Sequence, residues 1–320
     1  MNLNSSMYEA LKVLDPIRLN FEPQGMVLLN LVLAFVMFGV ALNIKPSHIT
    51  DVVHRPKSVL IGLLSQFIVL PVATLLLTII FSKWLTPGVA LGMILVASCP
   101  GGNISNFVSS LAKGNIALSV SLTGISSIGA LLLTPLNFSL YGTLYLSFIE
   151  HKSALAQPIS IDPEQMFQTV FIILGIPLIL GYFTAKYFPK FTKIVNTPIK
   201  ILSILVFAGF VAVAFRNNYY YFARYIHYIL AIVLVHNTVA LLSGYSFASL
   251  FKLNQQNRRT IAIETGIQNS GLGLALIFNP KIFSVDLEIG GMAFIVAWWG
   301  IWHIISGLGL AFWWSKNPIE

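Results

Sequence analysis

The chain has 320 residues, of which 56% are hydrophobic and only 9% are charged, and its formal net charge is +8. A soluble domain carries about 25% charged residues, so this composition, with a mean hydropathy of +0.81, excludes a soluble protein and indicates many membrane crossings. The positive charge then fits cytoplasmic loops that meet the anionic lipid of a bilayer, and it does not indicate a nucleic-acid partner.

A membrane-spanning helix needs roughly 20 mainly apolar residues, and this criterion predicts an all-α protein with nine spans. In chain order they are 26–43, 58–81, 89–111, 115–140, 166–187, 201–215, 225–251, 260–278 and 289–314. If residues 1–25 lie outside, most Lys and Arg residues fall in inner loops, as the positive-inside rule requires. We therefore expect an outer N-terminus, an outer loop at 147–165 and a cytoplasmic C-terminus.

The third and eighth predicted spans are each interrupted at mid-depth. The first interruption is Cys-Pro-Gly-Gly-Asn-Ile-Ser-Asn at 99–106, and the second is Glu-Thr-Gly-Ile-Gln-Asn-Ser-Gly at 264–271. Proline removes a backbone donor and glycine loses extra entropy in a helix, so a lipid-facing helix would avoid both. Unwound backbone at this depth survives only where it is buried in protein or lines a cavity. Interrupted spans in matching positions of two halves indicate the binding site of a secondary transporter.

The two interrupted spans are five crossings apart, so they run antiparallel through the bilayer. An inverted repeat produces this arrangement, with the first four spans matching the last four and the fifth as connector.

Glu264 is the only acidic residue within a predicted span. A charge there costs several kcal/mol unless it is partnered, and its place at the edge of a helix break favours a cation ligand. The carbonyls of Thr265 and Ile267 and the amide oxygen of Gln268 are further hard oxygen donors, which alkali cations prefer. The alternative is a structural role, with a neutral, hydrogen-bonded carboxyl group.

Hydroxyl and amide groups in neighbouring spans could join such a site. Ser119 and Thr123 are four residues apart, so they share one helix face, and a short turn folds that face against Ser105 and Asn106. Hydroxyls of this kind can also simply bond to their own helix. Gln66 could either hold helices together or contribute an amide oxygen to a cation.

Enzyme signatures are missing from the sequence. It has no Gly-rich phosphate loop after a strand, no His-Glu-x-x-His and no nucleophile elbow. We therefore expect a carrier and not an enzyme.

Together these segments resemble the bile acid:sodium symporter family and its bacterial homologues. The matching stretches are 34–40, 66–71, 99–106, 114–119 and 264–271, in the family's order. The resemblance implies a core domain, at 58–146 and 225–315, that rocks against a panel domain at 26–43 and 166–215.

The resemblance also implies two sodium sites beside the crossing of the interrupted helices. The first site would use Ser105, Asn106, Ser119, Thr123 and Glu264. The second site would use Gln66, Glu264, Gln268 and the carbonyls of Thr265 and Ile267. Sodium would be the co-transported ion.

The substrate implied by the resemblance is a small organic anion of the bile-acid-like, steroid sulfate, pantoate or keto acid class. Backbone amides at the half-helix N-termini, around Asn103-Ile104 and Asn269, would receive its negative charge. Some relatives place an asparagine after the histidine of the last span, whereas this chain has His303 followed by Ile304. Two alternatives remain open: a proton-coupled organic anion carrier of the same fold, or a carrier of a metalloid such as arsenite.

Overall fold

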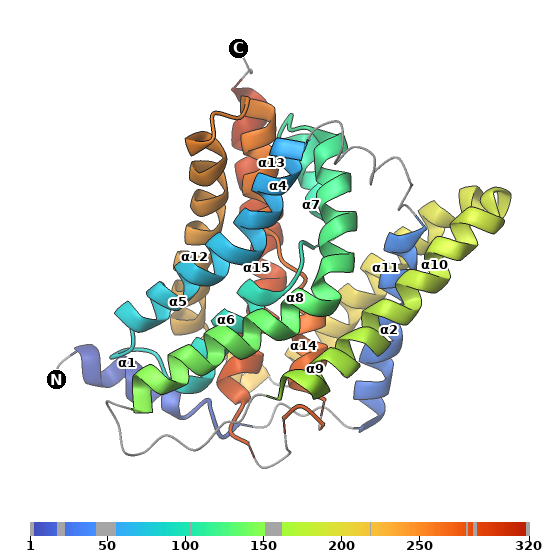
Figure 1. The fold of residues 1–320 in the computed structure, drawn as a ribbon. Helices are drawn as coiled ribbons and strands as arrows, with labels where there is room; N and C mark the ends of the chain where they lie inside the picture. Colours follow the sequence, from blue (N-terminus) through green and yellow to red (C-terminus); the bar gives the residue numbers. More distant parts are fainter. Residues whose placement is uncertain are drawn as a thin grey trace.

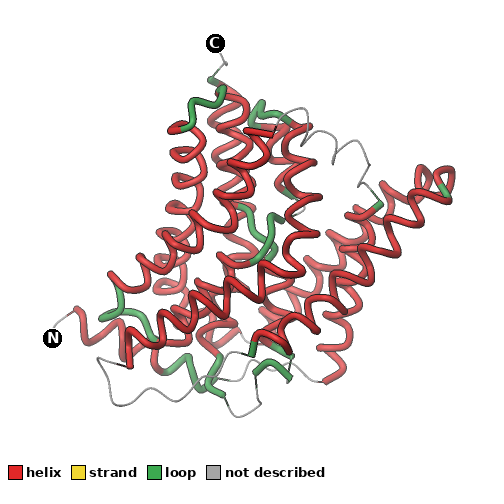
Figure 2. The backbone as a smooth tube through the Cα atoms, viewed as in Figure 1, coloured by secondary structure: helices red, strands yellow, loops and turns green. Residues whose placement is uncertain are grey.

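The computed structural model describes residues 3–17, 23–42, 56–102, 104–150, 162–217, 219–279, 281–283 and 287–317, which are helical almost throughout (Figures 1 and 2). Within these ranges there is no strand, which confirms the all-α prediction. Five stretches are long and apolar enough to cross a membrane: Pro56–Ile80, Ile116–Ile149, Pro163–Tyr187, Ala223–Leu250 and Gly290–Lys316. Two shorter apolar helices are Asn30–Gly39 and Pro87–Ser98.

The first half of the chain runs from α1 to α8. Its elements are α1 (Leu3–Lys12), α2 (Pro23–Ala41), α4 (Pro56–Leu64), the π-helical turn η1 (Ser65–Val69), α5 (Leu70–Ile80), α6 (Pro87–Ser98), α7 (Ser105–Leu111) and α8 (Ile116–Glu150). The fourth predicted span, which was expected to end at residue 140, continues as α8 to Glu150 through Pro135.

The second half runs from α9 to α15. Its elements are α9 (Pro163–Val170), the π-helical turn η2 (Phe171–Gly175), α10 (Ile176–Tyr187), α11 (Pro189–Asn217), α12 (Tyr219–Leu250), α13 (Gln255–Gly266), α14 (Ser270–Ile277) and α15 (Gly290–Lys316). Every predicted span overlaps one of these helices, while the number of crossings stays a prediction. The predicted loop 147–165 is partly helical, and its residues 151–161 lie outside the described ranges.

Both predicted helix interruptions are present, and they pair with each other. Gly101 and Gln268 form an isolated antiparallel bridge, in which Gly102 N donates to Ile267 O at 2.7 Å. On the other side of the bridge, Asn269 N donates to Pro100 O at 2.8 Å. Each break therefore supplies backbone partners that the other lost on leaving the helix, and we call this meeting point the crossing.

A proline sets the local geometry beside the crossing. Pro71 has no N–H to give to a carbonyl one turn earlier, and the helix widens into the π turn η1 just before it, where Leu70 N bonds Ser65 O. The carbonyl of Phe67 is instead held by Asn137 Nδ2 of α8 at 2.8 Å. The widened turn places Ser65 and Gln66 inside the protein.

The helices fall into two groups by their packing. One group is α2, which packs against α10 and α11, and Figure 1 shows these three helices leaning away from the rest of the bundle. In the other group, α15 packs against α6, α12 and α14, and α12 packs along α13. Helix α1 lies at the end of the molecule opposite to the C-terminal end of α15 (Figure 1).

Candidate functional site

The carboxylate of Glu264 lies in the last turn of α13, only 1% exposed, and hydroxyl groups from two other helices point to it. Ser105 Oγ, in the first turn of α7, donates to Glu264 Oε1 at 2.7 Å. Ser119 Oγ of α8 donates to the same oxygen, and Thr123 Oγ1 of α8 lies 3.1 Å from Oε2. Among the described residues, the hydrogen-bond partners of Glu264 are thus neutral hydroxyls, and none is a cationic side chain.

The cluster contains more oxygen acceptors than protons. Thr123 has one hydroxyl proton, yet Oγ1 lies 3.0 Å from Ser119 O, 3.3 Å from Asn106 Oδ1 and 3.1 Å from Glu264 Oε2. A hydroxyl can donate only once, so several of these oxygens face one another without a proton between them. A cation bound among them would satisfy the remaining acceptors. The structure therefore brings together all five residues that the resemblance assigned to the first sodium site.

Two buried amides lie on the other side of the carboxylate. Gln66 is 1% exposed and Gln268 is fully buried. Both amide heavy atoms of Gln66, and Oε1 of Gln268, lack a hydrogen-bond partner among the described residues. Buried polar groups without partners cost about 1–3 kcal/mol each, so a polar ligand that bound these atoms would remove that cost.

Gly101 shows how close these groups lie to one another. A Cβ atom on Gly101 would come within 3.0 Å of Glu264 Oε2 and 3.2 Å of Gln66 Nε2. Glycine at this position keeps open the space between the carboxylate and the amide. Glu264 Oε1 therefore accepts from Ser105 and Ser119, while Oε2 lies between Thr123 and the Gln66 side.

The two predicted backbone ligands are present but already hydrogen-bonded. Gln268 Nε2 donates to Thr265 O at 2.7 Å, and Gly102 N donates to Ile267 O at 2.7 Å. A carbonyl oxygen has two lone pairs, so one lone pair on each remains for a cation.

Several polar residues at the crossing were not predicted from the sequence. Ser65 Oγ lies 2.9 Å from Thr265 Oγ1, and Asn237 Nδ2 donates to Gly266 O at 2.8 Å. Ser306 Oγ in turn donates to Asn237 Oδ1 at 2.6 Å. The signal available for Asn237 was an amide side chain inside an apolar span, which resembles the signal used for Gln66.

Of the predicted substrate residues near the breaks, Asn103 lies outside the described ranges. Ile104 is the N-cap residue of α7 and makes no side-chain cap. Asn269 is engaged twice: its backbone N–H donates to Pro100 O, and its Oδ1 accepts from Leu272 N at 3.1 Å. The backbone N–H of Asn269 is therefore not free to donate to an anion in this conformation.

The remaining substrate candidates lie on one face of α15. A Cβ on Gly300 would meet Ser270 Oγ at 2.7 Å, and one on Gly307 would meet Ile267 Cδ1 at 2.9 Å, so this face packs against the second break. His303 and Ile304 lie between these glycines on the same face. His303 is buried, and its Nδ1 has no hydrogen-bond partner among the described residues.

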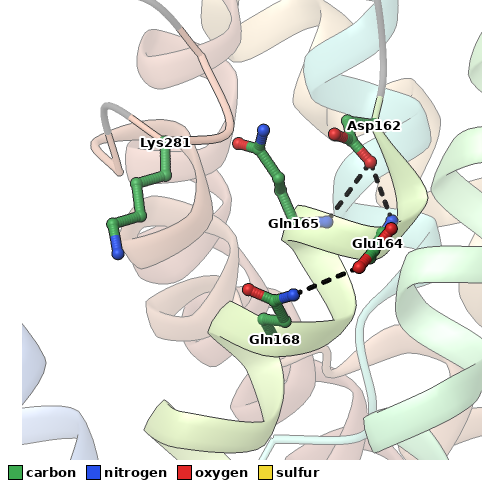
Figure 3. Close-up of a pocket in the computed structure, with 5 residues that line it drawn as sticks. All are labelled: Asp162, Glu164, Gln165, Gln168 and Lys281. Carbon is green, nitrogen blue, oxygen red and sulfur yellow. Dashed lines mark hydrogen bonds between the residues drawn. The ribbon is translucent and has the colours of Figure 1, made fainter.

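A solvent-open pocket of about 630 Å³ lies elsewhere, at the start of α9 (Figure 3). Asp162 Oδ1 accepts there from the backbone N–H groups of Glu164 at 2.9 Å and Gln165 at 3.3 Å, which caps the helix. Gln168 and Lys281 complete the lining, and no lining residue belongs to either break. Its two carboxylates would repel an anionic substrate, so the crossing remains the better candidate.

Comparisons with known proteins identify the family of this chain. Residues 30–225 match the model of the sodium bile acid symporter family. The chain is 31% identical to an uncharacterized sodium-dependent transporter, YocS, of Bacillus subtilis, over 90% of this chain and 83% of that protein. It is 28% identical to the probable chloroplastic sodium/metabolite cotransporter BASS1 of Arabidopsis thaliana, covering 89% of this chain and 66% of the relative.

A third relative is the sodium-dependent organic anion transporter of Mus musculus, which is 28% identical over 88% of this chain and 71% of that protein. These relatives are transporters and not enzymes, as expected from the sequence. The chain belongs to the sodium bile acid symporter family.

Proposed function

We propose that this protein is a sodium-coupled symporter that imports a small organic anion by alternating access. The observation that carries the proposal is the buried carboxylate of Glu264, which accepts hydrogen bonds from Ser105 and Ser119. An ionised group at this depth needs a compensating charge. Sodium fits because its ligands are hard oxygens and the surrounding groups are hydroxyl, amide and carbonyl oxygens.

The proposal includes two sodium sites that share Glu264. The first has Ser105, Asn106, Ser119 and Thr123 around the carboxylate, and the second has Gln66, Gln268 and the carbonyls of Thr265 and Ile267. The partnerless amide atoms of Gln66 and Gln268 support the second site. A proton on Glu264 alone would leave these amides unsatisfied, so sodium coupling accounts for more of the structure than proton coupling.

Sharing one carboxylate between two cations gives a physical reason for coupling to an anion. Two sodium ions and one ionised Glu264 leave one net positive charge at the crossing. A bound monoanion would neutralise that charge within a low-dielectric site, where electrostatic attraction is strong. Sodium binding would thereby raise the affinity for an organic anion, and the anion would raise the affinity for sodium equally.

Alternating access would arise from motion between the two groups of helices. We propose that α2, α10 and α11, with α9, form the panel, and that the helices around the crossing form the core. The chain would lie in a bacterial cell membrane with nine crossings, its N-terminus outside and its C-terminus inside. The packing of α2 against α10 and α11 supports this division.

The experiment uses purified protein in proteoliposomes loaded with potassium. A screen of organic anions by thermal stability, with sodium or potassium, identifies a ligand, because a ligand that binds the folded state raises its apparent stability. We expect uptake of that anion to require an inward sodium gradient. Uptake that is driven by a pH gradient without sodium would instead establish the proton-coupled alternative.

The metalloid alternative depends on Cys99, the single cysteine. This side chain is fully buried and lies against α14, where a Cβ on Gly273 would meet Cys99 Sγ at 3.8 Å. Loss of arsenite uptake in Cys99→Ser, with no uptake of organic anions by the wild type, would favour the metalloid reading over the symporter.

A further inference from the structure

The C-terminal end of α13 exposes carbonyl groups that have lost their helical partners. Those of Thr265 and Ile267 are bonded by groups from the breaks themselves, Gln268 Nε2 and Gly102 N. The carbonyl of Gly266, which lies between them, is bonded from outside the breaks by Asn237 Nδ2 at 2.8 Å. One side chain of α12 thus reaches the break from a helix that supplies no ligand to either proposed sodium site.

The amide of Asn237 is held in a single orientation. It is 1% exposed, and Ser306 Oγ of α15 donates to its Oδ1 at 2.6 Å. A rotated amide would place Oδ1 against the carbonyl oxygen of Gly266 and lose both hydrogen bonds. Ser306 Oγ also lies 3.3 Å from His303 O, a weaker interaction within its own helix. One amide therefore joins α12, the second break and α15.

The direction of the Gly266 carbonyl affects the carbonyl that follows it. Ile267 has extended backbone angles, with φ −110° and ψ 99°. Successive carbonyls in an extended segment point to opposite sides. Because Asn237 draws the Gly266 carbonyl towards α12, the Ile267 carbonyl points the other way, towards the first break, where Gly102 N bonds it.

Close packing keeps Asn237 at a fixed distance from this backbone. Asn237, Leu241 and Gly244 are spaced four and three residues apart, so they share one face of α12. A Cβ on Gly244 would come within 2.9 Å of Ala262 Cα, so the two backbones almost touch there. The side chain of Leu241 covers Gly266 on the same face. Helix α12 is therefore packed directly against the break and cannot approach it more closely.

We propose that Asn237 is a positioning residue for the second sodium site, which acts by fixing the peptide of Gly266 and is itself oriented by Ser306. This proposal rests on the proposed function, because it requires that the carbonyls of Thr265 and Ile267 bind sodium. Asn237 acts on those ligands through the backbone.

The test measures sodium half-saturation through the thermal stability of the purified full chain, with potassium replacing sodium. Ser306→Ala removes the hydroxyl that orients Asn237, and we expect it to raise the half-saturating sodium concentration three- to tenfold. Ser306→Thr keeps a hydroxyl and should restore the wild-type value. Ser243→Ala is a matched control, because Ser243 Oγ donates only to Ala240 O of its own helix at 2.9 Å.

Double variants assign the effect to one site. If Asn237 acts through the second site, Ser306→Ala should add little to Gln66→Ala but should multiply the effect of Thr123→Ala, since groups that share one site are not additive. Asn237→Ala should give the largest rise, and if this variant fails to fold, the Ser306 series still decides the proposal.

The outcomes separate the positioning role from the proposed function. A wild-type protein that sodium stabilises, together with a Ser306→Ala variant of equal half-saturation, overturns the positioning role and leaves the sodium sites standing. If Ser306→Ala is less stable than the wild type without sodium but has an unchanged half-saturating sodium concentration, the residue is purely structural, and this result also overturns the positioning role. A wild-type protein that sodium does not stabilise overturns both proposals.

Discussion

Glu264 lies buried inside the protein, where ionisation of a side chain costs the most free energy if no positive charge is nearby. Its partners are Ser105, Ser119 and Thr123, which can donate hydrogen bonds but cannot neutralise it. Removing one partner of a buried charge costs more than the net value of the interaction. The side chain is therefore suited to bind a cation that enters and leaves, because the hydroxyls remain as partners between binding events.

Single-residue changes should weaken one sodium site at a time. Thr123→Ala removes an oxygen from the hydroxyl cluster, and Gln66→Ala removes the amide on the opposite side of Glu264. Each should raise the sodium half-saturation of transport several-fold, or roughly 1–2 kcal/mol per lost polar interaction. Titrations of sodium-dependent uptake measure this directly.

Matched controls exist for both changes. Thr78 is a buried threonine whose hydroxyl donates to Leu75 O of its own helix at 2.8 Å, so Thr78→Ala should leave the sodium dependence unchanged. Gln168→Ala, at an exposed position in the last turn of α9, serves the same purpose for Gln66. If Thr123→Ala and Gln66→Ala gave the same sodium titration curves as the wild type, the proposed ligands would be refuted.

Ile304 should influence which anion is preferred. It is half-buried and lies by helix geometry on the face of α15 that packs against the second break, at a position where the resemblance implies an asparagine in some relatives. Sites with buried polar partners discriminate strongly for hydroxylated substrates, so we expect this chain to prefer anions with a sizeable apolar body. Ile304→Asn should shift relative affinity towards hydroxylated members of matched pairs, and Ile304→Leu should not. Equal shifts in both variants would exclude a role in selectivity.

At the scale of whole elements, the N-terminal segment is fixed to the ends of two core helices. Gly290 N, at the start of α15, donates to Asp15 O at 2.9 Å. The Asp15 side chain, 9% exposed, occupies the space that Cβ atoms on Gly88 of α6 and Gly291 of α15 would fill. Carboxylates are favourable near helix N-termini, yet burial opposes ionisation here.

Burial is the main cause that raises the pKa of Asp15 from 3.8 to about 7, with a smaller contribution from the negative charge of Glu288. Between these two values only the folded protein holds the proton, so stability should fall as pH rises through this window, by about 1.4 kcal/mol per pH unit for this group. Above pH 7 the contribution levels off. Asp15→Asn should remove this part of the slope.

Thermal unfolding of the wild type and Asp15→Asn between pH 5 and 8 checks this expectation. Asp162→Asn is the control, since Asp162 caps α9 at the protein surface. Identical slopes in the wild type and Asp15→Asn would show that the docked carboxylate does not govern the pH dependence.

Local chemistry explains which elements were predictable. The breaks at 99–106 and 264–271 could be predicted from Pro100, Gly101 and Gly266, which disfavour a regular helix. Their antiparallel crossing was predictable because the two predicted spans are an odd number of crossings apart. The start of α11 was missed because Pro198 lies inside a continuous helix, where packing outweighs its usual effect. The end of α8 at Glu150 was missed because the length of one membrane crossing set the predicted end at residue 140, and the helix continues beyond that length.

Contacts between distant residues could not be predicted. Asn237 and Ser306 are 69 positions apart, and Ser65 meets Thr265 across 200 positions, so no local pattern connects them. The two sodium sites could be predicted only from the complete motifs that carry the resemblance. The hydroxyls of Ser119 and Thr123 taken alone are also compatible with hydrogen bonds to their own helix.

For the whole molecule, the proposed transport cycle requires that the crossing stays rigid while the protein exposes it first to one side of the membrane and then to the other. Buried Arg259 of α13 joins the C-terminal ends of α7 and α15, because it donates to Ala112 O and Trp314 O at 3.0 Å each. Asp15 joins the N-terminal ends of α6 and α15. Such links at both ends favour movement of α2, α10 and α11 as a separate group, with the proposed sodium sites kept intact.

The central claim is that the oxygen cluster around Glu264 binds sodium. Equilibrium binding of radioactive sodium to the purified chain tests it most directly, with Glu264→Gln as the variant, since the amide keeps the shape and removes the charge. We predict saturable binding of two sodium ions per wild-type chain, displaced by unlabelled sodium but not by potassium, and nearly abolished in a folded Glu264→Gln variant. Equal sodium binding by the two proteins would contradict the claim.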